Sequence, residues 1–418
     1  MELSFDSPRG MRDFYPEDMI LRNRVFDAWR GAAALSGFQP YDACVVESLE
    51  LLQRKSGEEV SEQIYAFEDK SGRKLALRPE MTPTLARMVA ARQGSLQFPI
   101  KWTTIAQCFR YERMTRGRKR EHYQWNLDIV GEESVSAEGE LLNTAVTAIR
   151  AMGIPDTAWY IHISSRLLLS ELLAKLGIPE SAHPGVFLAL DKRGKIPDAE
   201  IAEIMRAGGV SEADTGKAFE LLNLASLDAA AAILGPESKA VGQLREVFRT
   251  AELYGFSEIL KFDIAVIRGL SYYTGIVFEA FDANRTLRAI FGGGRYDSLL
   301  TTIGGAATPA VGMGFGDVVV VELIKDIQKD VPKTSQAGTA IGFMFAEQRE
   351  AAVKLARRFR ETGTRVELML APIKPKQFFS RVGNGGFTEA IFIGPDDVAS
   401  GRVQLKHLET REAESITL

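Results

Sequence analysis

Apolar residues recur at helical spacing in two long parts of the chain. The first is 18–35, which ends just before Gly37. One stripe of this segment carries four large apolar side chains: Ile20, Val25, Phe26 and Trp29. The second part, about 168–257, is rich in Leu and Ala and contains runs such as LLLSELLAKL and LREVFRTAELY. We therefore expect an amphipathic helix near the start of the chain and a wholly helical segment in its middle.

Apolar and polar residues alternate in other segments, as is typical of half-buried strands. Two of them, KWTTIAQCFRYER and HYQWNLDIVG, are separated by the basic stretch MTRGRKRE, which predicts an antiparallel hairpin with a basic loop. Further strands are expected in six segments: PYDACVVE, 74–77, KFDIAVI, IVFEAFD, LRAIFGG and AVGMGFG. Thr82, which precedes Pro83, and Asp317 are each expected to cap a following helix.

The pattern changes near residue 326. Residues 326–338 are polar with little periodicity, so they are interpreted as a linker. Strands and helices alternate over 339–418, which predicts a small α/β domain with helices on a largely parallel sheet. Residues 1–325 are expected to form an α+β domain, in which the helical segment interrupts an antiparallel sheet.

Composition restricts the class of protein. The 418 residues are 45% hydrophobic and 25% charged, and the net charge is −4, so nucleic-acid binding would depend on local basic patches. Two cysteines fit a reducing compartment, and four widely separated histidines argue against a zinc site. No apolar run approaches the ~18 residues of a membrane span, and the first residues lack a signal-peptide core. We expect a cytoplasmic protein without a membrane segment.

One face of the predicted hairpin is polar, because alternate residues of a strand share a face. It carries Arg110, Glu112, Gln124, Asn126 and Asp128. The other face is suited to a core and carries Phe109, Tyr111, Tyr123, Trp125, Leu127 and Ile129. The loop adds five cations, which suit phosphate oxygens: Arg113, Arg116, Arg118, Lys119 and Arg120. A solvated outer face and a phosphate-binding site explain this pattern equally well.

Other segments also have both a functional and a structural explanation. In RGLSYYTG, Arg268 is followed by Tyr272 and Tyr273, which fits either a ligand pocket or a salt bridge beside core tyrosines. Alternate glycines in AVGMGFG, and again in GGGR, leave room for a flat ring, a phosphate or a closely packed helix. Glu80 of RPEMT suits either an amine ligand or a surface turn. Together these segments describe an antiparallel sheet that binds ATP and an α-amine.

The stretch FRYERMTRGRKREHYQWNLDIVG resembles motif 2 of class II aminoacyl-tRNA synthetases. RPEMT and RGLSYYTGIVFE are similar to the signature segments of the histidyl-tRNA synthetase family, and GMRDFYPED and GGGRYDSLL also match it. The resemblance covers nearly the whole chain. It implies a class II catalytic domain with a helical insertion, and a C-terminal anticodon-binding domain. It also implies a homodimer that joins L-histidine to tRNA(His), using ATP with Mg2+.

The resemblance implies roles for individual residues. Histidine would lie against Glu80, Met81, Thr82, Arg110, Gln124, Asp128, Arg268, Tyr272 and Tyr273. ATP would lie against Arg110, Glu112, Arg118, Gly312, Gly314 and Gly316. Arg110 and Arg268 would be the catalytic cations on either side of the α-phosphate, and no metal-binding site built by the protein is implied.

Four positions depart from the family pattern. Cys44 stands at the proline that ends motif 1, and Val319 stands at the arginine that ends motif 3 and covers adenine. Ser271 replaces an acidic residue, and Asp128 stands where many bacterial members have Glu.

Two alternatives stay open at this point. One is the non-catalytic regulatory subunit of ATP phosphoribosyltransferase, which resembles the catalytic domain, and the departures at Val319 and Ser271 favour it. The C-terminal domain and the three arginines Arg110, Arg118 and Arg268 favour the synthetase. The other alternative is an RNA-binding scaffold without catalysis.

Overall fold

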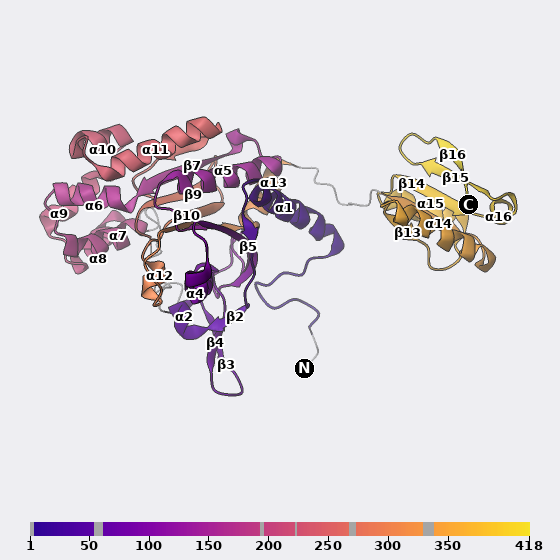
Figure 1. Cartoon of the computed structure of the whole chain (residues 1–418), viewed down its shortest axis with the longest axis horizontal. Helices are drawn as coiled ribbons and strands as arrows, with labels where there is room; N and C mark the ends of the chain where they lie inside the picture. Colours follow the sequence, from indigo (N-terminus) through magenta and orange to yellow (C-terminus); the bar gives the residue numbers. More distant parts are fainter. Residues whose placement is uncertain (1–3, 54–61, 193–195, 222–223, 267–272, 329–337) are drawn as a thin grey trace. The chain divides into compact units, whose positions relative to one another are not determined.

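The computed structural model describes residues 4–53, 62–192, 196–221, 224–266, 273–328 and 338–418. The chain forms two compact units, one that contains Arg22–Lys329 and one that contains Asp330–Leu418 (Figure 1). Each unit has its own β-sheet and its own hydrophobic core, as is typical of separate domains.

An eight-stranded sheet with the order β1-β5-β6-β11-β10-β9-β7-β8 forms the centre of the first unit. Its inner pairs are antiparallel, whereas the outer pairs β1–β5 and β7–β8 are parallel. The strands are β1 (Gln39–Pro40), β5 (Ile100–Phe109), β6 (Glu121–Val130), β7 (Trp159–Ser165), β8 (Leu260–Phe262), β9 (Ile276–Asp282), β10 (Phe291–Arg295) and β11 (Ala310–Gly316). The predicted α+β class with an antiparallel sheet is confirmed.

One face of this sheet, which we call the back face, is covered by helices. They are α1 (Pro16–Leu35), α5 (Ser136–Ala151) and α13 (Asp317–Ile327). Trp125 of β6 stacks on Trp29 of α1 with ring centroids 5.8 Å apart, and Trp29 also contacts Phe315 of β11 at 5.3 Å. Because side chains alternate along a strand, the even-numbered residues of β5 and β6 lie on the opposite, front face.

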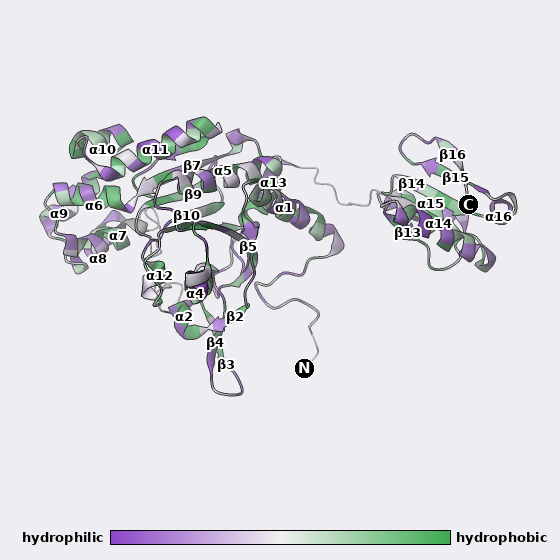
Figure 2. Ribbon diagram, in the orientation of Figure 1, coloured by the Kyte–Doolittle hydropathy of each residue, from purple (hydrophilic) through white to green (hydrophobic). Residues whose placement is uncertain are grey.

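A group of helices between β7 and β8 forms the helical segment expected from the sequence. They are α6 (Arg166–Lys175), α7 (His183–Asp191), α8 (Asp198–Ala207), α9 (Glu212–Leu221), α10 (Leu227–Leu234) and α11 (Lys239–Tyr254). Ser165 caps α6 by accepting the Leu168 N–H at 3.3 Å, and Gly255 ends α11 in the left-handed conformation. Figure 2 shows both hydrophobic and hydrophilic residues on these helices, as their amphipathic pattern predicts.

Smaller elements complete the first unit. A three-stranded sheet has the order β2-β4-β3, with bounds Val46–Ser48, Lys74–Leu77 and Tyr65–Glu68 respectively. The remaining helices are α2 (Leu49–Gln53), α4 (Thr82–Arg92) and α12 (Leu299–Thr302), with single 3-10 turns at Gln93–Ser95, Asp156–Ala158, Glu180–Ala182 and Ser257–Ile259. Leu85 of α4 and Leu299 of α12 share a buried cluster with Val130 and Ala310, so these two helices cover one end of the front face.

Both predicted helix caps are wrong. Thr82 is the first residue of α4, whose N-cap is Met81 and has no side-chain hydrogen bond. Asp317 is the first residue of α13 rather than its cap. Its carboxylate accepts the Tyr123 N–H at 2.9 Å and pairs with Arg12 at 3.0 Å, so tertiary contacts occupy the oxygens that a cap would use.

Three strand predictions need new boundaries. PYDACVVE does not form one strand, because Gln39–Pro40 joins the large sheet and Val46–Ser48 joins the small one. KFDIAVI contributes only the end of Leu260–Phe262, and the strand predicted at LRAIFGG begins at Phe291. Strand β5 ends at Phe109, so Tyr111 lies beyond it and is 56% exposed rather than part of the core.

The second unit has a five-stranded sheet with the order β13-β12-β14-β15-β16. Its elements are β12 (Thr339–Phe343), a 3-10 turn (Ala346–Gln348), α14 (Arg349–Glu361), β13 (Val366–Leu368), α15 (Pro375–Asn384), β14 (Glu389–Ile393), α16 (Pro395–Ser400), β15 (Arg402–His407) and β16 (Ala413–Thr417). The first three strands are parallel, as predicted, but β15 and β16 add an antiparallel hairpin. The sequence analysis missed this hairpin because β16 is mostly exposed and lacks an apolar stripe.

Candidate active site

The front face brings together polar residues from β6 and glycines from β11. Asp128 lies opposite Gly312 and Gln124 lies opposite Gly316. A Cβ atom added to Gly312 would lie 2.0 Å from Asp128 Oδ1, and one added to Gly314 would lie 2.8 Å from the Gln124 amide. A Cβ atom on Gly316 would meet no atom within 4 Å. The first two glycines therefore make room for polar side chains of the protein itself, and open space remains at the third.

Asp128 is the most deeply buried acid of this face. The Tyr296 hydroxyl donates a 2.6 Å hydrogen bond to Oδ1, whereas Oδ2 is buried and has no hydrogen-bond partner among the described residues. Burial raises the pKa of Asp128 to about 7, and the nearby Glu80 carboxylate adds to this rise while the Tyr296 hydrogen bond opposes it. The role of Tyr296 was not predicted, although it belongs to the recognised segment GGGRYDSLL.

The RPEMT loop is fixed beside the end of β5 by arginines. The Arg110 Nε donates to the Pro79 carbonyl at 2.9 Å. Arg78 is buried and donates to the carbonyls of Gln107 at 2.9 Å and Ala43 at 3.0 Å. These bonds hold the adjacent Glu80, which is also buried, next to the front face. The sequence analysis did not single out Arg78.

The two residues that follow Glu80 are buried in the same loop. Met81 packs in a small cluster with Ala106 and Cys108 of β5. Thr82 is buried at the start of α4. The structure thus brings five predicted histidine-binding residues to one region around the front face: Glu80, Met81, Arg110, Gln124 and Asp128.

The basic loop between β5 and β6 forms several contacts with the protein. Arg118 pairs with Glu112 at 2.7 Å, and Arg116 pairs with Glu322 of α13 at 2.9 Å. The Arg120 guanidinium lies 3.9 Å from the centroid of the Tyr111 ring. Two of the five cations thus pair with carboxylates of the described residues, so a phosphate ligand at Arg118 would compete with Glu112.

His122 lies on the front face near the start of β6, opposite Cys108, and the Arg110 charge acts on it. Burial, with a further contribution from the Arg110 charge, lowers the pKa of His122 to about 3. The ring is therefore neutral near pH 7. The positive charges that act on this ring are those of Arg110 and Arg12.

The predicted residues 268, 271 and 272 lie outside the described part of the chain, so the structure does not describe Arg268, Ser271 and Tyr272. Tyr273 is described and is buried in the cluster of α4 and α12. Val319, at the position of the motif 3 arginine, is buried and lies beside the basic loop. A Cβ atom on Gly117 of that loop would lie 3.4 Å from Val319 and 3.8 Å from the Cβ of Arg288.

Cys44 is exposed, and its Sγ lies 3.8 Å from both Glu47 and Arg87. Across the described ranges, no three His, Cys, Asp or Glu side chains gather as a metal site. The same ranges contain no helix of the length and apolarity needed to cross a membrane.

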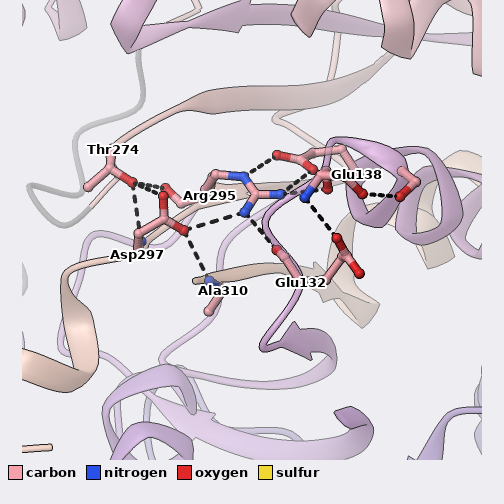
Figure 3. Close-up of polar contacts among 8 residues, drawn as sticks. Glu132, Glu138, Thr274, Arg295, Asp297 and Ala310 are labelled. Atoms are coloured by element: carbon pink, nitrogen blue, oxygen red, sulfur yellow. Dashed lines mark hydrogen bonds and ion pairs between the residues drawn. The ribbon is translucent and has the colours of Figure 1, made fainter. Parts of the chain in front are cut away.

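A second buried polar cluster lies on the back face and is fully paired. Arg295, at the end of β10, binds both oxygens of Glu138 on α5, at 2.7 and 2.6 Å (Figure 3). Its remaining N–H groups reach the carbonyls of Glu132 at 2.9 Å and Ser134 at 3.1 Å, and Asp297 at 3.4 Å. The arginine of GGGR is therefore a structural residue in this chain.

Comparison with known proteins gives a consistent result. The family profile described as histidyl-tRNA synthetase matches residues 10–316, and the profile described as anticodon binding domain matches residues 318–418. The chain is 42% identical to the chloroplastic/mitochondrial histidine–tRNA ligase of Arabidopsis thaliana, over 100% of this chain and 86% of that protein. It is 39% identical to the histidine–tRNA ligase of Opitutus terrae, over 98% of this chain and 95% of that protein.

Solved structures have the same fold. A histidyl-tRNA synthetase from Nostoc sp. superposes with a TM-score of 0.82 at 24% identity, covering 100% of this chain and 97% of that one. A protein from Bacillus halodurans described as ATP phosphoribosyltransferase regulatory subunit/histidyl-tRNA synthetase gives 0.78 at 24% identity, covering 94% and 99%. The synthetase and the protein described as a regulatory subunit/synthetase share this fold, so the fold alone does not separate them. The two family profiles and the identities of 42% and 39% to histidine–tRNA ligases are specific to the synthetase family. The chain belongs to the histidyl-tRNA synthetase family.

Proposed function

We propose that this chain activates L-histidine with ATP and then transfers the histidyl group to tRNA(His). The observation that carries the proposal is the front face, where the buried Glu80 carboxylate lies near that of Asp128 and the Arg110 guanidinium donates to the carbonyl of Pro79, next to Glu80. A free amino acid presents the complementary charges, because its ammonium suits the Glu80 carboxylate and its carboxylate suits the arginine. Membership of an aminoacyl-tRNA ligase family supports the same chemistry.

The proposed reaction has two steps. The histidine carboxylate attacks the α-phosphorus of ATP, the bond to the β-phosphate breaks, and pyrophosphate leaves. A terminal ribose hydroxyl of tRNA then attacks the acyl carbon of histidyl-adenylate, and AMP leaves. The first step needs no nucleophilic side chain, so the protein contributes by aligning the two substrates and stabilising charge at the phosphorus.

Arg110 is proposed to hold the α-phosphate and the histidine carboxylate from one side, and Arg268 from the other. A guanidinium can bind both groups with two parallel hydrogen bonds, which aligns the attacking oxygen with the phosphorus. Glu80, Thr82 and Gln124 are proposed to bind the α-amine. Asp128, with Tyr272 and Tyr273, is proposed to bind the imidazole.

The nucleotide is proposed to lie over the open end of the glycine strand, at Gly316. Arg118 then exchanges its partner Glu112 for the outer phosphates. Val319 cannot provide a cation over adenine, so the ring rests on apolar atoms or meets another arginine. Arg288 is the candidate, because Arg288 and Val319 both lie close to Gly117 of the basic loop. Mg2+ is proposed to enter with ATP, held chiefly by phosphate oxygens.

Homodimerisation through α1 and the segment that follows it, and a cytoplasmic location, are proposed from the family resemblance. The second unit is proposed to bind the anticodon arm of tRNA(His). Its exposed cations at the start and along α15, Lys374, Lys376 and Arg381, provide a basic patch, although Arg381 also pairs with Glu367 at 2.9 Å. Phosphate contacts of this kind are weakened by salt.

The proposal is tested by exchange of labelled pyrophosphate into ATP. Exchange that depends on L-histidine, in the intact chain, is the expected result. Arg268→Ala should reduce the exchange rate by about 10²-fold or more without changing the melting temperature, and Arg268→Lys should recover only part of the loss. Exchange that is absent in the wild type, with histidine still bound, would instead favour the regulatory-subunit alternative.

The tRNA-binding role of the second unit needs a separate test. Lys376→Glu is expected to raise the KM for tRNA in aminoacylation and to leave pyrophosphate exchange unchanged, because it adds a repulsive charge to the patch. Lys354→Glu on α14, also an exposed lysine, is the control. Equal effects of the two substitutions on the KM for tRNA would contradict the proposed patch.

A further inference from the structure

Tyr41 lies beside the site, at the edge of the large sheet. It follows β1, and its N–H donates to the Thr103 carbonyl at 2.9 Å, which continues the parallel register of Pro40 opposite Thr103. This register places Tyr41 on the front face, with Asp128. Its ring centroid lies 5.5 Å from that of Trp102, whose partner in the ladder is Asp128 itself.

The Tyr41 ring connects two hydrophobic clusters that border the site. One is the cluster of Met81, Ala106 and Cys108. The other is the cluster of α4 and α12, which also contains Tyr273 and Tyr296. Tyr41 therefore lies between the RPEMT loop and the tyrosine that donates to Asp128.

The Tyr41 hydroxyl and Asp128 Oδ2 are buried oxygen atoms of this region that have no hydrogen-bond partner among the described residues. Leaving such a group unsatisfied costs about 1–3 kcal/mol, so native structures rarely contain one that no water or ligand completes. The charged or titratable groups that affect Tyr41 are Asp128, Arg78, Cys108 and Asp42. Burial, followed by the Asp128 charge, raises the pKa of Tyr41 well above its usual range, so its hydroxyl keeps its proton and can donate.

A neutral imidazole has one N–H donor and one nitrogen acceptor on the same ring. Asp128 Oδ2 supplies an acceptor and the Tyr41 hydroxyl supplies a donor, which is the complementary pair. We propose that Tyr41 is a specificity-determining residue that donates a hydrogen bond to the unprotonated ring nitrogen of bound histidine, while Asp128 accepts the ring N–H. This inference rests on the proposed function, and it adds a contact that none of the recognised segments contains.

A hydrogen bond from Tyr41 is also compatible with the shorter acid at position 128. An aspartate reaches one methylene less far than the glutamate found in many bacterial members. A phenol from the sheet edge adds a second polar contact for the same ring. The pocket then identifies its substrate by a donor and an acceptor, so a hydrocarbon side chain leaves both protein groups unpaired.

Tyr41→Phe removes the hydroxyl and keeps the ring, so it tests the proposal directly. We expect the KM for L-histidine in pyrophosphate exchange to rise by about 5- to 100-fold, as for a hydrogen bond lost to a buried ring nitrogen. The KM for ATP should stay within about twofold, since Tyr41 would contact only the amino acid. The melting temperature without ligand should stay equal or rise, because the variant loses an unsatisfied buried group.

Tyr160→Phe is the matched control. Tyr160 lies on β7, and its hydroxyl accepts a 2.7 Å hydrogen bond from Arg285, away from the proposed site. The KM for histidine should not change in this variant. Tyr41→Met, which fills the position without a hydroxyl, should reproduce the loss if Tyr41→Phe proves unstable.

Calorimetric titration with L-histidine alone tests the Tyr41 contact separately from the proposed enzymatic activity. If the wild type binds histidine but does not exchange pyrophosphate, the proposed activity is wrong, and a 5- to 100-fold weaker affinity of Tyr41→Phe would still support the Tyr41 contact. If Tyr41→Phe binds histidine within about twofold of the wild type, the contact is wrong whether or not the enzyme is active. A wild type that binds no histidine would overturn both.

Discussion

Two of the buried polar clusters on the large sheet differ in one respect. On the back face, Arg295 and Glu138 satisfy each other through two short hydrogen bonds, and backbone carbonyls take the remaining N–H groups of the arginine (Figure 3). On the front face, the Asp128 carboxylate has one partner, Tyr296, and its other oxygen is buried without a hydrogen bond from the described residues.

Such a difference is expected between a structural network and the proposed binding site. A buried charge whose hydrogen bonds are complete holds α5 to β10 and has no remaining capacity for a ligand. A buried acid with an open oxygen reduces the stability of the free protein, and a substrate N–H would complete it. We therefore propose that the buried carboxylate of the front face binds a ligand, whereas that of the back face is structural.

The largest expected effect comes from breaking the paired cluster. Glu138→Ala leaves the Arg295 charge buried without its partner, so it should destabilise the protein by about 3–5 kcal/mol in denaturant unfolding. Glu140→Ala on the same helix is the control. Glu140 pairs with Lys101 at 2.6 Å near the surface, and its loss should cost about 1 kcal/mol or less. Equal losses in the two variants would contradict the structural role of the cluster.

The next effect concerns activity. Arg110→Ala should lower histidine-dependent pyrophosphate exchange by about 10²-fold or more, because a preorganised cation is lost at the phosphorus. The melting temperature should change little, since the side chain gives up one hydrogen bond to a carbonyl. Arg249→Ala, at an exposed arginine of α11, serves as the control. A normal rate of pyrophosphate exchange in Arg110→Ala would contradict the proposed role of Arg110.

Asp128 should make the free energy of unfolding fall as the pH rises. Because the folded-state pKa of Asp128 is raised to about 7, the folded protein holds this proton at pH values where the unfolded chain has released it. Stability from this group is therefore lost as the pH rises from about 4 to about 7. Asp128→Asn should melt higher than the wild type at pH 8, and the difference should shrink at pH 5. A constant difference across this range would contradict the raised pKa.

The smallest expected effect is on the KM for ATP. If Arg288 takes the place of the missing motif 3 arginine, Arg288→Ala should raise the KM for ATP by about 2- to 30-fold, which corresponds to the loss of a cation–π contact. The KM for histidine should not change. An unchanged KM for ATP would indicate that apolar packing, which includes Val319, supports the ring alone.

Local pattern predicted much of the fold. The hairpin of β5 and β6 and the helices between β7 and β8 follow from periodicity, since each buries one face. The errors lie where tertiary contacts decide. Thr82 and Asp317 have the right chemistry for caps, but Asp317 is held by Arg12 and Tyr123, which are distant in sequence. The residues around Asp317 in the sequence do not indicate that Arg12 and Tyr123 bind its carboxylate.

The sequence predicted only those residues of the candidate site that belong to recognised family motifs. Asp128, Gln124 and Glu80 belong to recognised segments, and the structure places them around one face. The partner Tyr296 and the neighbouring Tyr41 could not be assigned, because their relation to Asp128 depends on how β1 and α12 meet the sheet. The two glycines Gly312 and Gly314 were expected to receive a ligand, whereas here they also accommodate protein side chains.

Asp128, with its unpaired oxygen, is proposed to bind histidine, and the fully paired Glu138 is not. The most direct test compares Asp128→Asn with Glu138→Gln at pH 8 by thermal unfolding, with and without L-histidine. We expect Asp128→Asn to melt at or above the wild type and to gain no stabilisation from histidine. We expect Glu138→Gln to melt lower and to be stabilised by histidine as much as the wild type is. An Asp128→Asn variant that melts lower and still responds fully to histidine would contradict this proposal.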